Sequence, residues 1–225
     1  MNDLESRSAQ TLDPHPEPVV YIVDDEDMPR RSVSVLVESV GLKAKAYPSA
    51  EDFIADYQDE GVGCLVVDIR MPGMNGLELL EHLRDQDISL PTVVITGYAR
   101  TRTTVKAMKL GAVTLLEKIY EEDDLLDAIR AGIRTHEKQR EEQKEIRSIE
   151  ARLQQLTPKE NTVLQCMIKG DANKNIANEL EVSLRTVEAR RQAIFQKAEA
   201  NSLAELVTMV MKLKNYRARN PETES

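Results

Sequence analysis

Residues 64–80 read CLVVDIRMPGMNGLELL, and this stretch decides the fold of the N-terminal half of the chain. Its apolar run ends in Asp68, and such a run predicts a strand buried on both faces, as strands of parallel sheets are. From Asn75 to about Gln86 the pattern is that of a helix. A strand, an acidic residue at its carboxyl end and a following helix together predict one β-α unit.

The same unit recurs on both sides of this stretch. Further strands are predicted at residues 19–23, 42–47, 92–95 and 113–116, and further helices at 29–40, 49–59, 101–110 and from residue 121 onward. Alternating strands and helices, with strands that are apolar throughout, favour a parallel sheet covered by helices on both faces. We therefore predict a doubly wound α/β domain with a five-stranded parallel sheet over residues 18–134.

Composition limits the remaining possibilities. The 225 residues fit one large domain or two small ones. The net charge of −9 is unevenly distributed, with −11 in residues 1–134, 0 in residues 135–156 and +2 in residues 157–225. No apolar run is long enough to span a membrane, and the N-terminus lacks the apolar core of a secretion signal. Cys64 and Cys166 are expected as buried free thiols in a reducing cytoplasm.

The second half of the chain predicts helices only. Residues 135–156 contain neither Gly nor Pro and predict a helical linker, whereas residues 1–17 and 216–225 are polar and predict disordered tails. The linker carries a heptad-like stripe of Ile146, Ile149, Leu153 and Leu156. This stripe predicts either a solvated helix or one that assists the pairing of two chains.

After the linker, Thr157, Pro158 and Glu160 form the signature of a helix start. Breaks at residues 170–171, 181–183 and 201–202 then divide residues 157–215 into four short helices. We predict a small all-α domain there.

Five polar residues follow the predicted strands of the first domain: Asp24, Asp25, Asp68, Thr96 and Lys118. Ligands of doubly wound sheets bind at the carboxyl ends of strands, so we expect these side chains to lie together. Three carboxylates there need a cation, and oxygen ligands with open positions suit Mg²⁺. Lys118 and Thr96 could bind phosphoryl oxygens, and Asp68 is a candidate phosphoryl acceptor. A helix cap is the alternative role for any single Asp.

Residues 176–191 have the spacing of a helix-turn-helix, whose second helix lies in the major groove of DNA. Basic residues on and around that helix are predicted to contact phosphates: Lys174, Arg185, Arg190, Arg191 and Lys197. One face is predicted to meet base edges, through Arg185, Glu188, Ala189 and Gln192. A helical bundle with a charged face is the alternative. An RNA-binding output is a further one, although the Thr186-Val187-Glu188 pattern favours duplex DNA.

Four motifs, VYIVDDED, LVVDIRMPGMNGLELL, VVITGYA and LLEKIY, occur in this order and resemble the receiver domain of two-component response regulators, with its flavodoxin/CheY-like fold. The resemblance implies that Asp68 accepts a phosphoryl group from a sensor histidine kinase. It also implies that Asp25, Asp68 and the Arg70 carbonyl ligate Mg²⁺, with Asp24 acting through a water. Thr96 and Lys118 would contact the phosphoryl oxygens.

Two departures from the receiver pattern bear on the switch. Ile119 stands where receivers usually have Pro after the Lys, so a trans bond is expected, and a displaced Lys118 is one possible consequence. Leu115 stands where an aromatic switch residue is usual, and Tyr98 or Tyr120 are candidate substitutes. An alternative therefore stays open, in which the receiver is a constitutive dimerisation or protein-interaction module that works without phosphorylation.

The stretches LTPKENTVL and KGDANKNIANELEVSLRTVEARRQAIFQKAEANSLAELV closely resemble the LuxR-type tetrahelical helix-turn-helix. The chain as a whole resembles response regulators of the FixJ/NarL type, and residues 185–198 would be its recognition helix. The resemblance implies a cytoplasmic transcription factor that binds promoter DNA and pairs as a homodimer when phosphorylated. RNA polymerase is a further candidate partner. The chain would be no enzyme beyond its own phosphoryl transfer and dephosphorylation.

Overall fold

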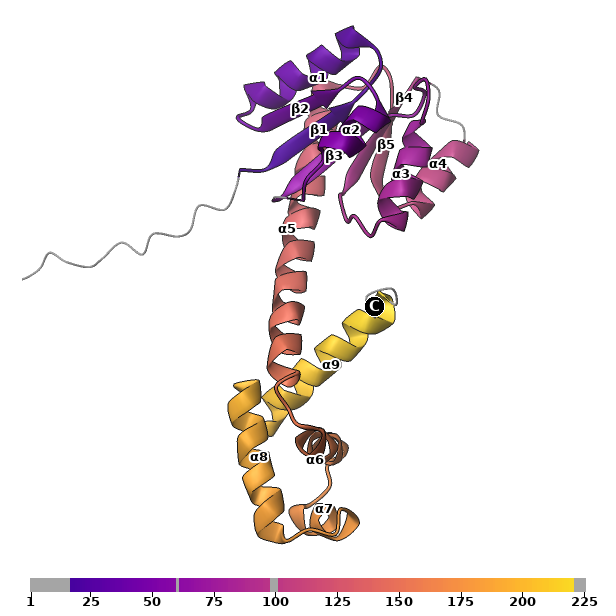
Figure 1. Cartoon of the computed structure of the whole chain (residues 1–225). Coiled ribbons are helices and arrows are strands. Elements are labelled where there is room, and N and C mark those ends of the chain that lie inside the picture. Colours follow the sequence, from indigo (N-terminus) through magenta and orange to yellow (C-terminus); the bar gives the residue numbers. More distant parts are fainter. Residues whose placement is uncertain (1–16, 60, 98–100, 221–225) are drawn as a thin grey trace, which may run out of the picture. The chain divides into compact units, whose positions relative to one another are not determined.

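The structure is a computed structural model that describes residues 17–59, 61–97 and 101–220. The chain divides into two compact units, residues 1–140 and 141–225, and the division falls inside one long helix. Figure 1 traces the elements along the chain. Each unit is described by itself.

The first unit alternates strands and helices. Its strands are β1 (Val19–Val23), β2 (Lys43–Tyr47), β3 (Gly63–Asp68), β4 (Thr92–Thr96) and β5 (Ala112–Glu117). Its helices are α1 (Asp27–Ser39), α2 (Ala50–Asp56), α3 (Gly76–Asp85), α4 (Thr101–Lys109) and the start of α5 (Glu122–Leu153). The strands pair in parallel in the order β2-β1-β3-β4-β5. The predicted doubly wound fold is confirmed.

Two apolar cores lie on the two faces of the sheet, because successive side chains of a strand point to opposite faces. Val20 and Ile22 of β1 pack with buried residues of α1 and α5. Tyr21 and Val23 pack on the other side with residues of α2, α3 and α4. Both faces of β3 are therefore covered, and all six of its residues are buried. This explains the continuous apolar run that the sequence shows at this strand.

The helix α5 takes part in both units. Its first turns bury Leu125, Ile129 and Ile133 against the sheet. Farther along, the Nδ1 atom of the buried His136 lies 2.9 Å from the backbone nitrogen of Gly63, at the start of β3. Among the described helices, none combines the length and the apolar character needed to cross a membrane, and this includes the highly charged α5.

The second unit contains the end of α5 and the helices α6 (Pro158–Lys169), α7 (Asn173–Glu179), α8 (Leu184–Ala198) and α9 (Leu203–Arg219). The predicted capping box at the start of α6 is present, since the Thr157 hydroxyl accepts from Glu160 N–H while Glu160 accepts from Thr157 N–H. The four predicted helices and their breaks are confirmed.

The last helix is longer than the sequence predicted. The composition predicts a disordered tail over residues 216–225, but α9 continues through Arg219. Basic side chains of its last turns pair with acidic side chains of α5: Lys212 with Glu145, Arg217 with Glu150 and Arg219 with Glu142. These pairs and the apolar face of α9 explain why the helix persists to that point.

The apolar stripe of the linker is covered within its own chain. Ile146 and Ile149 are 5% and 2% exposed, and Ile149 belongs to the core of the second unit together with residues of α6, α8 and α9. Leu153 and Leu156 pack against the same core. The stripe is therefore neither a solvated surface nor an open seam for a second chain in this structure.

Candidate functional site

The carboxyl ends of four neighbouring strands bring the predicted polar residues together. The register pairs Val23 of β1 with Val67 of β3, Asp68 with Ile95 of β4, and Thr96 with Glu117 of β5. Asp24, Asp68, Thr96 and Lys118 therefore lie at one edge of the sheet. One carboxylate oxygen from each of Asp24, Asp25 and Asp68 lies within 4.8 Å of the others.

The Lys118 ammonium occupies the centre of this edge. Its Nζ lies 3.4 Å from Asp24 Oδ2 and 3.4 Å from Asp68 Oδ1, and 3.7 Å from Glu26 Oε1. Asp24 and Asp68 are 6% and 5% exposed, so one cation faces two nearly buried carboxylates. Glu26 was not among the residues that the sequence singled out.

Backbone N–H groups hold the two buried carboxylates, and a side-chain donor holds the backbone of the turn after β1. Glu26 N–H donates to Asp24 Oδ1 at 2.8 Å, and Arg70 N–H donates to Asp68 Oδ2 at 3.2 Å. Arg30 of α1 donates to the backbone carbonyls of Asp24 at 2.8 Å and Asp25 at 3.3 Å. Arg30 is thus a further site residue that sequence reasoning missed, because its role is to hold backbone atoms and only the turn between β1 and α1 creates it.

Gly76 lets α3 start directly behind the end of β3. Its N–H donates to the Ile69 carbonyl at 3.0 Å. A Cβ at this position would stand 2.3 Å from the Asp68 carbonyl oxygen, closer than any real contact. The glycine of the MNGLELL motif is therefore required by the close approach of helix and strand beside Asp68.

The bond between Lys118 and Ile119 is trans, since the described residues contain no cis peptide. The consequence considered from the sequence, a displaced Lys118, is not observed, because its Nζ contacts both carboxylates. The turn after Lys118 is made instead by Ile119 at φ 94°, an uncommon conformation for a β-branched residue. Its side chain is fully exposed. Lys118 N–H meanwhile donates to the Thr96 carbonyl at 2.6 Å, which ties the residue to β4.

Burial and charge oppose each other in this site. Desolvation raises the pKa of Asp24 and of Asp68 above the usual carboxyl range, although Lys118 lowers both. Desolvation by itself lowers the pKa of Lys118, but the two carboxylates outweigh it and the net shift is upward. A divalent cation would offset the repulsion among the acids, and a donor set made only of oxygens fits Mg²⁺. The residues present therefore fit the expected metal.

Leu115 and the candidate switch tyrosines have separate surroundings. Leu115 is half-buried and packs against the core that α2, α3 and α4 share. Tyr120 packs against the opposite core, beside α1 and α5 residues, where burial raises the pKa of its hydroxyl. Tyr98 lies outside the described residues. Among the described residues near Lys118, no aromatic side chain thus replaces the missing switch residue on the Leu115 side of the sheet.

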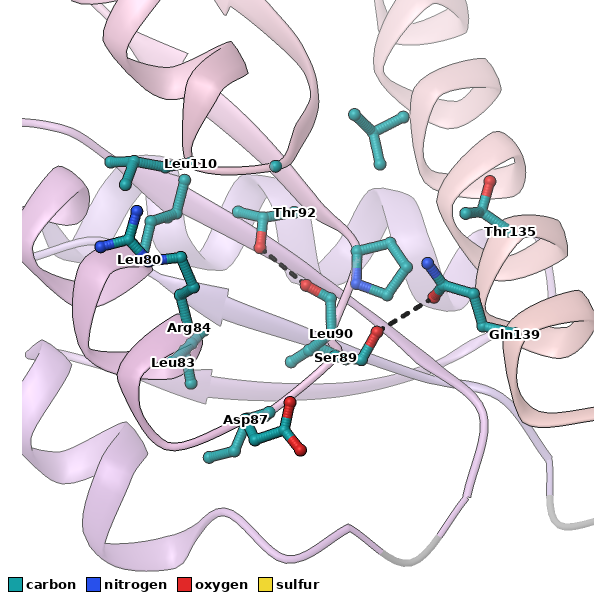
Figure 2. Close-up of a pocket in the computed structure, with 14 residues that line it drawn as sticks. Leu80, Leu83, Arg84, Asp87, Ser89, Leu90, Thr92, Leu110, Thr135 and Gln139 are labelled. Carbon is teal, nitrogen blue, oxygen red and sulfur yellow. Dashed lines mark hydrogen bonds between the residues drawn. The ribbon is translucent and has the colours of Figure 1, made fainter. Parts of the chain in front are cut away.

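A cavity lies at the opposite edge of the first unit. Its lining includes Leu83, Leu90 and Thr92, which stands at the start of β4, whereas Thr96 ends the same strand. Figure 2 shows the hydrogen bond between Ser89 and Gln139 of α5 at its rim. The cavity therefore shares no residue with the acidic site, which has the form of an open edge.

The second unit presents a helix-turn-helix formed by α7 and α8. Ser183 caps α8 by accepting from Thr186 N–H at 3.1 Å. The residues predicted to face base edges, Arg185, Glu188, Ala189 and Gln192, are all exposed. Lys174 is exposed as well, whereas Thr186, Arg190 and Arg191 are half-buried. The predicted contact face is therefore open along α8.

Lys197 has a partner inside the unit. Its Nζ lies 2.7 Å from Glu160 Oε2, the carboxylate that also closes the capping box of α6. This ion pair lowers the pKa of Glu160. Among the predicted phosphate-binding residues, Lys197 would have to leave this pair to reach DNA.

Comparison with known proteins agrees with both units. Residues 20–130 match the response regulator receiver domain, and residues 154–210 match the bacterial regulatory proteins of the luxR family. The transcriptional regulatory protein FixJ of Bradyrhizobium diazoefficiens is 37% identical over 86% of this chain and 94% of its own length. FixJ of Rhizobium meliloti is 40% identical over 85% and 94%, respectively.

Solved structures give the same result. The response regulator StyR matches with a TM-score of 0.79 at 39% identity, over 87% of this chain and 99% of its own. Full-length FixJ from B. japonicum matches with a TM-score of 0.54 at 36% identity, over 88% and 97%. The chain belongs to the response regulators that join a receiver domain to a LuxR-type DNA-binding domain.

Proposed function

We propose that Asp68 is the phosphoryl acceptor of this regulator and that its modification controls the binding of α8 to promoter DNA. The observation that carries the proposal is the Lys118 ammonium, 3.4 Å from both Asp24 and Asp68 at the carboxyl edge of the sheet. The donor would be a phosphohistidine of a sensor kinase, the partner that a receiver domain implies.

In the transfer, Asp68 Oδ forms a bond to phosphorus while the bond from phosphorus to the donor nitrogen breaks. Lys118 neutralises charge on the phosphoryl oxygens, and the Thr96 hydroxyl at the end of β4 offers them a hydrogen bond. Asp25, Asp68 and the Arg70 carbonyl would hold Mg²⁺, with Asp24 acting through a water, and the ion supplies further positive charge when bound. The Arg70 N–H keeps one Asp68 oxygen in place, so that the other can react.

Labelling by acetyl phosphate with Mg²⁺ tests the acceptor. We expect Asp68→Asn to abolish incorporation, while Asp127→Asn, a matched change at an exposed carboxylate of α5, leaves it intact. Undiminished labelling of Asp68→Asn would refute the assignment. The fold and the DNA-binding unit would be unaffected by that outcome.

The DNA-binding half of the proposal rests on the open face of α8. Gln192→Ala should change sequence preference, because Gln can bind adenine through two hydrogen bonds. Lys174→Ala should weaken binding to all sequences alike, because a phosphate contact carries no sequence information. A binding matrix over variant duplexes distinguishes the two, and uniform scaling in both variants would contradict the assignment of Gln192.

We further infer that phosphorylation changes how two chains pair. The buried state of Ile149 supports pairing through surfaces other than the linker stripe. Light scattering with and without Mg²⁺ and beryllofluoride, with Asp68→Asn as control, tests this. A shift from monomer to dimer in the wild type alone supports the switch. A constant mass together with unchanged DNA affinity would favour the phosphorylation-independent alternative, to which Leu115 points.

A further inference from the structure

A second group of metal-ligating side chains lies in the DNA-binding unit, away from the site already described. It consists of Cys166 on α6, Asp171 in the turn after α6 and Glu179 at the end of α7. The thiol sulfur and one oxygen of each carboxylate all lie within 4.8 Å of one another. The turn that joins α6 to α7 fixes this arrangement, since Asp171 N–H donates to the Cys166 carbonyl at 3.1 Å.

The surroundings of Cys166 differ from those of an ordinary core thiol. Its side chain is 3% exposed and packs in the core of the unit, yet its sulfur points to the side where the two carboxylates stand. Among the described residues, the one hydrogen-bond partner of this thiol is the backbone of Cys166 itself. Burial first, then the charges of Glu179 and Asp171, raise the pKa of the Cys166 thiol. Two anionic groups around a buried sulfur repel a thiolate but attract a cation.

Cys64 provides the contrast within the same chain. It is buried in the first unit, and burial raises the pKa of its thiol to about 12. Its sulfur contacts the Leu65 carbonyl at 3.7 Å, and it belongs to no group of metal-ligating side chains found among the described residues. Only Cys166, of the two, therefore combines burial with carboxylates in reach.

We propose that Cys166, Asp171 and Glu179 form a binding site for a divalent transition-metal ion of the zinc type, with water as a fourth ligand. Zn²⁺ accepts thiolate and carboxylate ligands in a tetrahedral arrangement. Mg²⁺ and Ca²⁺ prefer oxygen alone, so this site and the acidic edge of the receiver would select different ions. Binding releases the thiol proton to solvent, because the thiolate is the ligand.

The geometry requires little change. Sulfur and oxygen ligands of a tetrahedral Zn²⁺ lie about 3.5 Å apart, from bond lengths of about 2.3 and 2.0 Å. Since the ligand atoms lie within 4.8 Å of one another, they would close by at most about 1.3 Å. Asp171 is half-buried and Glu179 is exposed, so both can rotate. The ion would tie α6 to the carboxyl end of α7, directly before the turn that leads into α8, and would stabilise the helix-turn-helix.

Cobalt titration of the full chain tests the site, because thiolate bound to Co²⁺ gives a charge-transfer absorption that oxygen ligands do not. The titration is done in saturating Mg²⁺, which occupies the acidic edge. We expect the band in the wild type and in Cys64→Ser, and its loss in Cys166→Ser. Asp171→Asn and Glu179→Gln should each weaken Co²⁺ binding at least tenfold. Glu181→Gln, at a neighbouring exposed acid, should leave it unchanged.

Two outcomes would overturn the proposal. One is the absence of a thiolate band in the wild type at millimolar Co²⁺. The other is a band that Asp171→Asn and Glu179→Gln leave unaltered, which would mean binding by the thiol without the carboxylates. These two carboxylate variants keep the test decisive even if Cys166→Ser folds poorly. As a second measurement, Zn²⁺ should displace Co²⁺ and raise the unfolding midpoint of the second unit in wild type, but not in Glu179→Gln.

Discussion

Ile149 offers the sharpest test of the structural role of α5. The residue lies in the part of α5 that belongs to the second unit, and it is 2% exposed. Ile149→Ala removes three carbon atoms from the core. At about 0.8 kcal/mol per buried carbon, the transfer term is about 2.4 kcal/mol. A residual cavity adds to this, so we expect a loss of about 3 kcal/mol in the free energy of unfolding of the second unit, within the usual range for such changes.

Hydrogen exchange resolved by peptide, measured on the full chain, reports the stability of each unit separately. Such resolution is needed because a chain with two units does not unfold in a single two-state step. We expect faster exchange in α6, α8 and α9 of Ile149→Ala and no change in β1 to β5. Ser148→Ala, on the exposed side of the same helix, is the matched control and should change stability by less than about 0.5 kcal/mol.

Two results would refute this reasoning. A loss below about 1 kcal/mol in the second unit would mean that Ile149 does not contribute to its core. A loss that grows on dilution of the protein would mean that the stripe is buried by a second chain, as a heptad pattern allows.

Three further predictions concern the first unit. Ile119→Gly should raise the free energy of unfolding by about 1 kcal/mol, measured by denaturant titration. Glycine relieves the strain of φ 94°, which is worth about 1–3 kcal/mol, but it costs up to about 1 kcal/mol in backbone entropy. A destabilised variant would contradict this reasoning. Burial lowers the pKa of His136, so the unfolded chain takes up this proton first and stability falls as pH drops below about 6.5. His136→Gln should remove that part of the pH slope between pH 7 and 5, and an unchanged slope would exclude the histidine as its source. Arg30→Ala should slow the labelling of Asp68 by acetyl phosphate about tenfold. The variant loses the hydrogen bond from Arg30 to the Asp24 carbonyl, and a bond of about 1.4 kcal/mol corresponds to a factor of about ten. An unaltered rate would show that the turn after β1 keeps its position without Arg30.

Much of the acidic site could be predicted because its members are coded locally. Asp24 and Asp68 directly follow an apolar run, and Lys118 follows one after Glu117. The carboxyl ends of parallel strands share one edge, so these side chains meet there. Glu26 and Arg30 could not be found in this way. They lie in and after the turn that follows β1, and they matter only because that turn brings them against Lys118 and the backbone of Asp24.

The linker shows the limit of pattern reading most clearly. A stripe at spacings of three and four residues means that one face of a helix is apolar, but it does not say what covers that face. In the structure, Ile149 lies in the core of the DNA-binding unit, Ile146 is buried as well, and acidic residues beside them pair with α9. The same pairs explain why the basic end of α9 is helical where composition alone predicted a tail.

By itself, the sequence determined the order of strands and helices, the parallel sheet, the helix-turn-helix and the acidic edge, because each depends on the periodicity of neighbouring residues. Tertiary structure alone decided three features that join distant segments. These are the position of Lys118 between Asp24 and Asp68, the packing of Ile149 of α5 in the core of the second unit, and the approach of Asp171 and Glu179 to Cys166. Contacts between residues far apart in the chain depend on how faces pack, which no local pattern encodes.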